Sequence, residues 1–389
     1  MAFQNIYGDY AFTRNPVALD VKFPENLYDR KGGIFKIESY GKEVFEGRVF
    51  PPATLEISSL LDSFALWFPE PVITGSSPVI EIEDAGELAN RMVDLSITYS
   101  GHNLYHRLLP IPGGVSKQNL RVFASAGTDA FKARFFNYTG NFFFTARSAS
   151  WMIPVKESEL FPFYFIVDEP TPFFKIKTLD GLEIELGTFS TGVYALNLNC
   201  VRKLIAQEHS VLANVFDLYA NDKVSCRFII ERAEPSKNKA LIKFRNSLGV
   251  FEYLEITTAF VQSIDLEDSN NKVYSKYDTL TADYNSVRER IHIKDTLTAE
   301  IEVSHNLRSF LMDMLCSEEV YITGVFEYPV RVIPSVEEFS VALVLETPKK
   351  VTVLFEVSEM DKAHTPDIST VASSQKPGVF SQEFNDIFN

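Results

Sequence analysis

Two histidines with a four-residue spacing are the first candidates for chemistry, because that spacing on a helix can hold a metal ion. His102 and His106 occur in "GHNLYH", which follows a predicted strand and stands beside a segment rich in proline and glycine. No third ligand is evident near them. We therefore interpret the pair as solvent-exposed or hydrogen-bonded, and we predict no metal site.

The sequence gives equally little support for a catalytic nucleophile. Ser190 stands in "GTFSTG", where serine is far more often a turn former than a nucleophile. Glu208, His209 and Ser210 are consecutive, and this spacing does not bring a base onto its own neighbour. The chain contains no GxSxG, Walker, GxGxxG or HExxH motif. We therefore predict no catalytic residues and no cofactor.

Carboxylates are too numerous to identify a site by themselves. The chain has 52 Asp and Glu residues, and a pair such as Glu337 and Glu338 needs a fold to give it meaning. Residues 265–271 come nearest to a calcium loop, but they lack its glycine and its terminal glutamate, so we predict a solvated loop. An enzyme with a dispersed carboxylate site remains an alternative, and it predicts a deep pocket with converging acids.

The composition limits the kinds of partner. The net charge of −15 over 389 residues disfavours binding to nucleic acid or to anionic membranes. No apolar run approaches the ~20 residues of a membrane span, and the N-terminus does not resemble a signal peptide, so we expect folding in a cytoplasm. Cys200, Cys226 and Cys316 are widely spaced in apolar segments, which predicts buried thiols.

Short alternating runs of apolar and polar residues predict a mainly β protein with several antiparallel β-sandwich-like domains. Residues 108–119 are rich in proline, glycine and polar residues, and they mark the first expected boundary. The expected parts are an N-terminal β domain at 1–110, an aromatic-rich β domain at 111–207, a C-terminal β domain at 208–357 and an extended arm at 358–389.

The clearest hairpin is "FKIKTLDGLEIEL", residues 174–186. A three-residue loop with Gly181 in the left-handed region sorts apolar and charged side chains onto opposite faces. The predicted pairs are Phe174 with Leu186, Lys175 with Glu185, Ile176 with Ile184, and Lys177 with Glu183. Further strands are expected as a hairpin at 34–50, a hairpin about 139–141 and a four-stranded meander from about 211 to 256.

One amphipathic helix is predicted at 305–316, with Ser304 as its cap. Its apolar stripe has the spacing of one buried helix face and consists of Leu307, Phe310, Leu311, Met314 and Leu315. Strand patterns follow it at 319–324, 328–334 and 339–346. The helix is therefore expected to cover an open end or face of a β-sandwich.

The C-terminal arm is polar and contains two prolines, yet it ends in an apolar stripe. Phe380, Phe384, Ile387 and Phe388 have helical spacing. So short a segment cannot bury this stripe by itself, so we expect it to dock in a groove of this chain or of a neighbouring subunit.

Two segments together resemble a known group of proteins. "ALIKFRNSLGVFEYLEI" (240–256) is followed about fifty residues later by "FLMDMLCSEEVYITGVFEYPVRVIP" (310–334). The pairing resembles proteins of the tail modules of Bacteroidota bacteriophages and prophages, the crAss-like phages among them. The chain departs from the pattern at Arg245, where leucine is frequent, and at Val250 and Phe251, which replace a strand with tryptophan.

The resemblance implies a virion tail, baseplate or adaptor protein that is made in the cytoplasm of the host bacterium. It implies self-assembly into a homo-oligomeric ring, contacts with other virion proteins, and no active residues. The main alternative is a carbohydrate-binding or adhesion protein with an exposed aromatic shelf around Trp67 or Trp151. We instead predict that both tryptophans are core anchors at strand ends.

Overall fold

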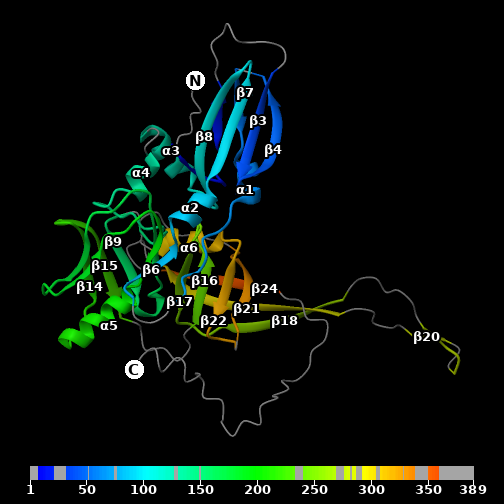
Figure 1. The fold of residues 1–389 in the computed structure, drawn as a ribbon. Helices are drawn as coiled ribbons and strands as arrows, with labels where there is room; N and C mark the ends of the chain where they lie inside the picture. Colours follow the sequence, from blue (N-terminus) through cyan, green and yellow to red (C-terminus); the bar gives the residue numbers. More distant parts are fainter. Residues whose placement is uncertain are drawn as a thin grey trace. The chain divides into compact units, whose positions relative to one another are not determined.

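A computed structural model of the chain describes residues 8–21, 32–50, 52–73, 77–126, 130–148, 150–232, 240–268, 276–280, 283–285, 291–303, 307–326, 328–337 and 349–358. Two units are distinguished, Met1–Val261 with Leu297–Glu356, and Gln262–Thr296 with Val357–Asn389. The protein is mainly β, as predicted, with most strands in four sheets of three to seven strands (Figure 1).

The first sheet has the order β1-β8-β7-β3-β4. Its strands are β1 (Tyr10–Phe12), β8 (His102–Ile111), β7 (Val93–Tyr99), β3 (Gly33–Ser39) and β4 (Lys42–Val49). β3 and β4 form the predicted hairpin, and positive φ angles at Tyr40 and Gly41 make its two-residue turn. The ribbon β2 (Ala18–Val21) with β5 (Ala53–Glu56), followed by α1 (Ser58–Phe64), packs into the same core.

The second sheet consists of β10 (Phe163–Val167), β13 (Gly192–Leu196) and β6 (Val79–Glu83), in that order. Every residue of β10 and β13 is buried, so these two strands are covered on both faces. Alternate residues of β10 enter two different cores: Phe163 and Phe165 face one, and Tyr164 and Ile166 face the other. A strand with apolar layers on both sides needs a continuous apolar run, which "FYFIV" provides.

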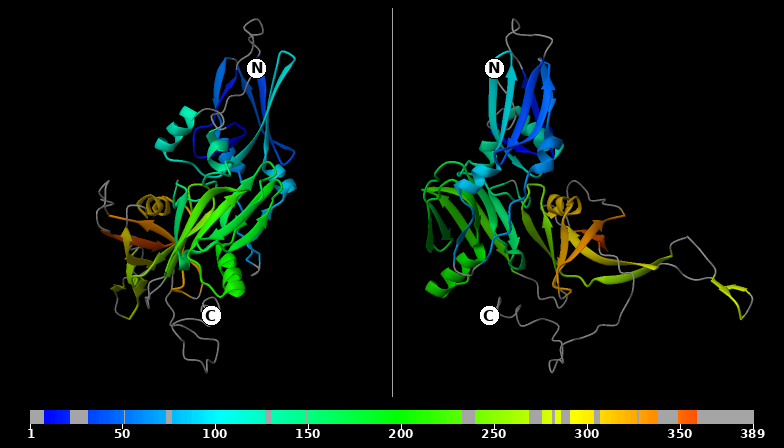
Figure 2. Two further views of the ribbon diagram at one scale, coloured as in Figure 1. Left: turned by 90° about the vertical axis from the view of Figure 1, so that its left-hand side faces the viewer. Right: turned by 45° about the vertical axis from the view of Figure 1, so that its right-hand side comes forward.

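The third sheet shares a core with one face of the second, so these two sheets pack in a sandwich-like manner. Its strands are β12 (Glu183–Gly187), β11 (Phe174–Thr178), β14 (Val215–Ala220), β15 (Lys223–Glu231) and β9 (Met152–Lys156). α5 (Leu198–His209) adds apolar residues to this core and lies beside the sheet (Figure 2).

The register of the β11–β12 hairpin is largely the predicted one. Ile176 lies opposite Ile184, and both predicted Lys–Glu pairs are present. Gly181 has a φ of 84°. The pairing of Phe174 with Leu186 is wrong, because a bulge after Phe174 sets it opposite Gly187.

The fourth sheet has seven strands in the order β17-β16-β22-β23-β24-β21-β18. Their bounds are β17 (Phe251–Ile256), β16 (Ala240–Arg245), β22 (Val320–Thr323), β23 (Val330–Ser335), β24 (Lys349–Val357), β21 (Ile291–Val303) and β18 (Val261–Asp268). β18 continues to Asp268, so the loop predicted at 265–271 is wrong for its first four residues. In the second unit β19 (Lys276–Asp278) pairs with β20 (Asp283–Asn285).

The predicted amphipathic helix is confirmed as α6 (Leu307–Leu315). Phe310, Leu311 and Met314 are buried, and the ring of Phe310 meets that of Phe244 on β16 with centroids 5.1 Å apart. Its predicted cap Ser304, the strand predicted at 339–346, and residues 359–389 with the docking stripe Phe380, Phe384, Ile387 and Phe388 lie outside the described residues.

The helices before α6 were not predicted. Besides α1 and α5 they are α2 (Ala85–Arg91), α3 (Lys117–Ala126) and α4 (Ala130–Phe135). The hairpin predicted about 139–141 is also wrong. Backbone groups there bond to side chains instead of a strand partner: Arg134 donates to the carbonyl oxygen of Phe143, whose amide donates to the Asn141 side chain.

The predicted four-stranded meander is divided between two sheets. β14 and β15 belong to the third sheet, whereas β16 and β17 belong to the fourth. The boundary predicted between residues 207 and 208 falls inside α5, and the third sheet joins strands from both sides of it. The first predicted boundary, residues 108–119, begins within β8.

Candidate functional site

The structure separates the residues that first suggested chemistry. His102 and His106 lie on strand β8, where four residues span about 13 Å, so the helical spacing of a metal pair does not apply. Ser190 Oγ lies 3.4 Å from the hydroxyl of Tyr194. His209 Nε2 lies 3.7 Å from the Glu208 carboxylate at the end of α5, which Ser210 terminates with a φ of 56°.

The cysteines and tryptophans differ in part from expectation. Cys200 and Cys226 are buried free thiols, as predicted, but Cys316 is exposed. Burial raises the pKa of the Cys226 thiol, which keeps it protonated. Trp151 is 45% exposed, with the Arg227 guanidinium 5.3 Å from its ring, so the prediction of a core anchor is wrong there.

Within the described ranges, no group of three or more His, Cys, Asp and Glu side chains is placed to hold a metal ion. In the same ranges, no helix has both the length and the apolar character of a membrane span.

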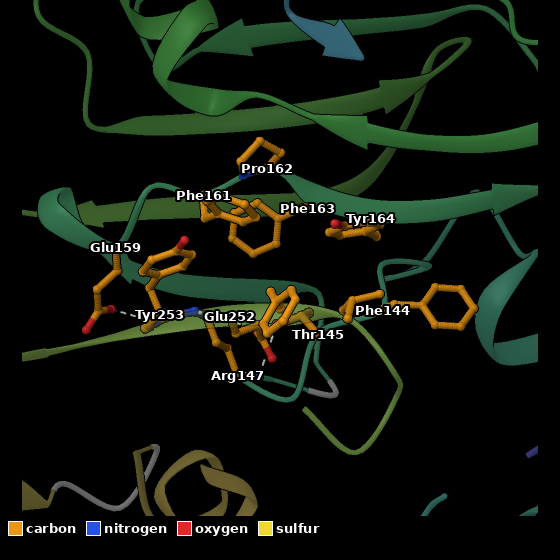
Figure 3. A pocket seen from close by; sticks show the side chains of 12 residues that line it. Phe144, Thr145, Arg147, Glu159, Phe161, Pro162, Phe163, Tyr164, Glu252 and Tyr253 are labelled. Atoms are coloured by element: carbon orange, nitrogen blue, oxygen red, sulfur yellow. Dashed lines mark hydrogen bonds and ion pairs between the residues drawn. The ribbon is translucent and has the colours of Figure 1, made fainter. Parts of the chain in front are cut away.

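The densest set of buried ionisable groups surrounds Arg147. We call Arg147, Glu159, Glu252 and Glu255 the Arg147 cluster, and Figure 3 shows the first three of them. Arg147 Nη1 donates to Glu159 Oε2 at 2.7 Å, and its Nε lies 3.6 Å from Glu252 Oε1. Nη2 donates to the backbone oxygen of Tyr253. The guanidinium therefore has a hydrogen-bond acceptor at each Nη atom and a carboxylate near Nε, and such partners are what a buried cation requires.

The Glu252 carboxylate accepts bonds on both oxygens. Thr145 Oγ1 donates to Oε1 at 2.6 Å, while Ala146 N and Asn246 Nδ2 donate to Oε2 at 2.9 and 2.6 Å. Burial nevertheless raises the pKa of Glu252, against the influence of Arg147 and these donors. With its oxygens committed to the protein, Glu252 is not presented as a base to a substrate.

Glu159 and Glu255 complete the cluster. Glu159 ends a 3₁₀ turn (Glu157–Glu159), and its Oε1 accepts the backbone N–H of Glu255 at 2.6 Å. The Glu255 carboxylate accepts from Ser158 Oγ and lies 3.8 Å from Lys156 Nζ. These bonds join the segment around β9 to β17, and thus the third sheet to the fourth.

The space beside the Arg147 cluster is small. The cavity lined by Arg147, Glu159, Glu252 and aromatic neighbours has a volume of about 10 Å³ (Figure 3). A single water needs about that much room. The cluster thus has the converging acids of a catalytic site but no space for a substrate, and its geometry suits the joining of sheets.

A tight turn, residues 246–249, extends this junction. Asn246 Oδ1 accepts the amides of Leu248 and Val250 at 3.0 and 3.1 Å. The Gly114 amide donates to the Ser247 carbonyl oxygen at 2.7 Å. Gly249 has a φ of 91°, and a Cβ atom there would collide with the Pro112 carbonyl oxygen. The turn is therefore held between β16 and the segment after β8.

α6 contacts the same turn through Asp313. Its two carboxylate oxygens accept the Ser247 amide at 3.0 and 3.1 Å. Loss of surrounding water raises the pKa of this half-buried carboxyl from 3.8 to about 7, with a smaller contribution from the charge of Glu252.

The raised pKa of Asp313 predicts a pH dependence. The folded state retains a proton between pH 4 and 7 that the unfolded chain has released, so this group stabilises the fold at low pH and the benefit is lost as pH rises through 7. Asp313→Asn keeps an acceptor for Ser247 and removes the titration. We expect the melting temperature of the wild type to fall relative to that of Asp313→Asn as the pH rises from 4 to 7. Parallel pH profiles from differential scanning fluorimetry would contradict this.

Trp67 packs against two guanidiniums. The Cζ atoms of Arg14 and Arg245 lie 5.0 and 4.6 Å from its ring. Each arginine also pairs with a glutamate at 2.6 Å, Arg14 with Glu318 and Arg245 with Glu319. The half-buried Trp67 thus contributes to the contact between the first sheet and the fourth. It is not the exposed aromatic shelf that the carbohydrate-binding alternative predicts.

Comparisons of the chain with protein-family models, with curated proteins and with solved structures found no significant match.

The sequence contained a partial signal for the Arg147 cluster. In "FEYLEI", Glu252 and Glu255 have opposite parity, so strand alternation directs at least one of them inward. Arg147 stands just after "FFFTA", an apolar run. The pairing could not be predicted, because Arg147 and Glu252 are 105 positions apart in the chain.

Proposed function

We propose that this chain is a non-enzymatic structural protein of a bacteriophage virion. It acts in the tail, baseplate or adaptor region, by self-assembly and by contacts with other virion proteins. It is made in the cytoplasm of the host bacterium, and it neither binds nucleic acid nor inserts into a membrane. The proposal rests on the resemblance of segments 240–256 and 310–334 to phage tail-module proteins.

The main support for a structural role is that the Arg147 cluster forms bonds between sheets. The most concentrated set of ionisable groups in the described part of the chain is consumed in bonds between sheets, beside a cavity of about 10 Å³. A subunit that transmits load in a particle needs such fixed junctions between its sheets. The same geometry offers an enzyme no space for a substrate.

Exposed apolar side chains support subunit contacts. The β22–β23 hairpin carries exposed Val325, Phe326, Tyr328 and Ile333, and Tyr328 is 74% exposed. Aromatic side chains on a surface are typical of protein interfaces. Both hairpin strands belong to the segment that resembles tail-module proteins.

The docking stripe supplies the test. We expect the quadruple change of Phe380, Phe384, Ile387 and Phe388 to serine to abolish assembly, because the arm loses the apolar face by which it binds a neighbouring subunit. Mass photometry should show oligomers for the wild type and monomers for the variant. Circular dichroism should show the same folded core in both.

The matched control changes polar positions of the same segment, Gln382, Glu383, Asn385 and Asn389, to serine. This control should assemble like the wild type, because the stripe is intact. If the stripe variant also forms the wild-type oligomer, the arm does not hold subunits together.

A further inference from the structure

The β22–β23 hairpin carries a row of apolar side chains that the described part of its own chain leaves exposed. We call Val325, Phe326, Tyr328 and Ile333 the hairpin patch. The first three lie in the connection between the two strands, and Ile333 lies on β23. Tyr328 and Ile333 are separated by up to about 16 Å of extended chain. Such a row on a surface indicates a contact with another protein segment.

Hydrogen bonds to neighbouring segments hold the hairpin in place. Thr323 Oγ1 donates to the carbonyl oxygen of Leu241 on β16 at 3.1 Å, and Arg331 Nη2 donates to that of Glu318 at 3.1 Å. Within the hairpin, Tyr321 pairs with Arg331 across the two strands. A patch on a fixed support loses little conformational entropy when a partner binds, which favours its use as a docking surface.

The C-terminal arm carries an apolar segment of comparable length. The helical spacing of the docking stripe predicts a length of about 12 Å from Phe380 to Phe388. The chain enters the arm after β24, which lies next to β23 in the fourth sheet. Residues 358–379, which precede the stripe, can span up to about 75 Å. This reach exceeds the diameter of a small domain, about 30 Å, so the stripe can reach the hairpin patch of an adjacent copy.

The charges of the two segments are complementary. Residues 377–389 contain Glu383 and Asp386 and no Lys or Arg. On β23, Arg331 and Ile333 are exposed on the same face, with the buried Val332 between them on the other. An acidic segment thus meets an apolar patch with an exposed cation beside it. Charges of this kind speed association and orient the partner more than they add affinity.

We propose that the hairpin patch of one copy receives the docking stripe of a neighbouring copy. This inference rests on the proposed function, and it names the surface at which the subunits meet. The contact joins two different surfaces, so it is heterologous, and it closes into a ring where the rotation between copies permits.

A fluorescent peptide of residues 377–389 tests this contact by fluorescence anisotropy. The receptor is the full-length variant with the four stripe residues changed to serine, because its own arm does not compete. We expect saturable binding of the peptide. Tyr328→Ser with Ile333→Ser in this receptor should weaken the binding by about tenfold or more, since large apolar side chains dominate such contacts.

Tyr105→Ser with Ile34→Ser in the same receptor is the matched control. These residues are 63% and 41% exposed, on strands β8 and β3 of the first sheet. The control should bind the peptide as the unmodified receptor does. The proposal is overturned if the peptide does not bind, or if the hairpin variant binds it as tightly as the control.

Mass photometry of the wild type separates this result from the proposed function. Wild-type oligomers together with a peptide that ignores the hairpin would mean that the subunits meet at another surface. Self-assembly would then stand while the present inference fails. A monomeric wild type would contradict self-assembly itself.

Crosslinking distinguishes docking on a neighbour from docking within one chain. Full-length chains with Val325→Cys and with Ser381→Cys, each with Cys316→Ser to remove the exposed native thiol, are mixed and treated with a flexible bismaleimide. We expect mass spectrometry to identify a link between positions 325 and 381 in chains of different variants. If the link forms only within a chain that carries both new cysteines, the docking is intramolecular and the proposal is overturned.

Discussion

Replacing Arg147 with methionine is expected to lower the free energy of unfolding by about 3–5 kcal/mol, the cost of removing one partner of a buried ion pair. Methionine retains much of the length and apolar volume of the side chain. It leaves the carboxylates of Glu159 and Glu252 without their shared cation, at sites where both are buried. The contact of the guanidinium with the ring of Phe310, 4.3 Å from its centroid, is also lost. Urea denaturation measures the change.

Arg107→Met is the matched control for Arg147→Met. Arg107 also pairs with a carboxylate, its Nε lying 3.4 Å from Asp94 Oδ1, but the two side chains are 46% and 34% exposed to water. Exposed ion pairs contribute little, so we expect a much smaller change. Equal losses for the two variants would mean that the Arg147 cluster is no stronger a junction than a surface pair.

Gly249→Ala is the second substitution with a large expected effect. An alanine at Gly249 adopts a left-handed φ, at a cost of about 1–2 kcal/mol, and its Cβ atom collides with the Pro112 carbonyl oxygen, which adds about 1–3 kcal/mol. The collision should separate the 246–249 turn from the segment after β8. Urea denaturation again gives the loss of stability.

Gly181→Ala separates the two costs of the Gly249 substitution. Gly181 has a φ of 84°, close to the 91° of Gly249, but no atom lies within 4 Å of its would-be Cβ. We expect it to lose only the backbone cost. Were both alanine variants to lose the same stability, the close contact at Pro112 would have no energetic role.

Local patterns predicted those parts of the fold in which neighbouring residues decide the outcome. In the β11–β12 hairpin, the pairing of Ile176 with Ile184 places both apolar and charged residues correctly, and Gly181 permits the loop. The apolar stripe of α6 likewise follows from the spacing of residues within one short segment. The bulge after Phe174 does not follow from the hairpin's own alternation, and β11 also pairs along its other edge with β14, a contact that the hairpin sequence does not contain.

Other parts depend on contacts that no local pattern contains. Phe142 and Phe143 enter one core and Phe144 enters another, so an aromatic run typical of a strand became a connection between layers. α2 has only seven residues, and its capping box of Asp84 and Glu87 is the local signal for its start. In the Arg147 cluster, each buried charge is stabilised by a partner from a segment that is distant in the sequence.

The junctions explain how a chain of separate sheets can serve as a building unit. The Arg147 cluster joins the third sheet to the fourth, and the contacts of Trp67 join the first to the fourth. Directional polar bonds fix these junctions, in addition to apolar packing. Under the proposed function, the exposed side chains of the β22–β23 hairpin and the docking stripe make the contacts with other subunits.

The sedimentation velocity of the unmodified, full-length chain over a wide range of concentrations tests the proposed assembly most directly. We predict a discrete species with several times the mass of one chain, in proportions that rise with concentration as mass action requires. A single species with the mass of one chain at every concentration would contradict self-assembly as the function of this protein.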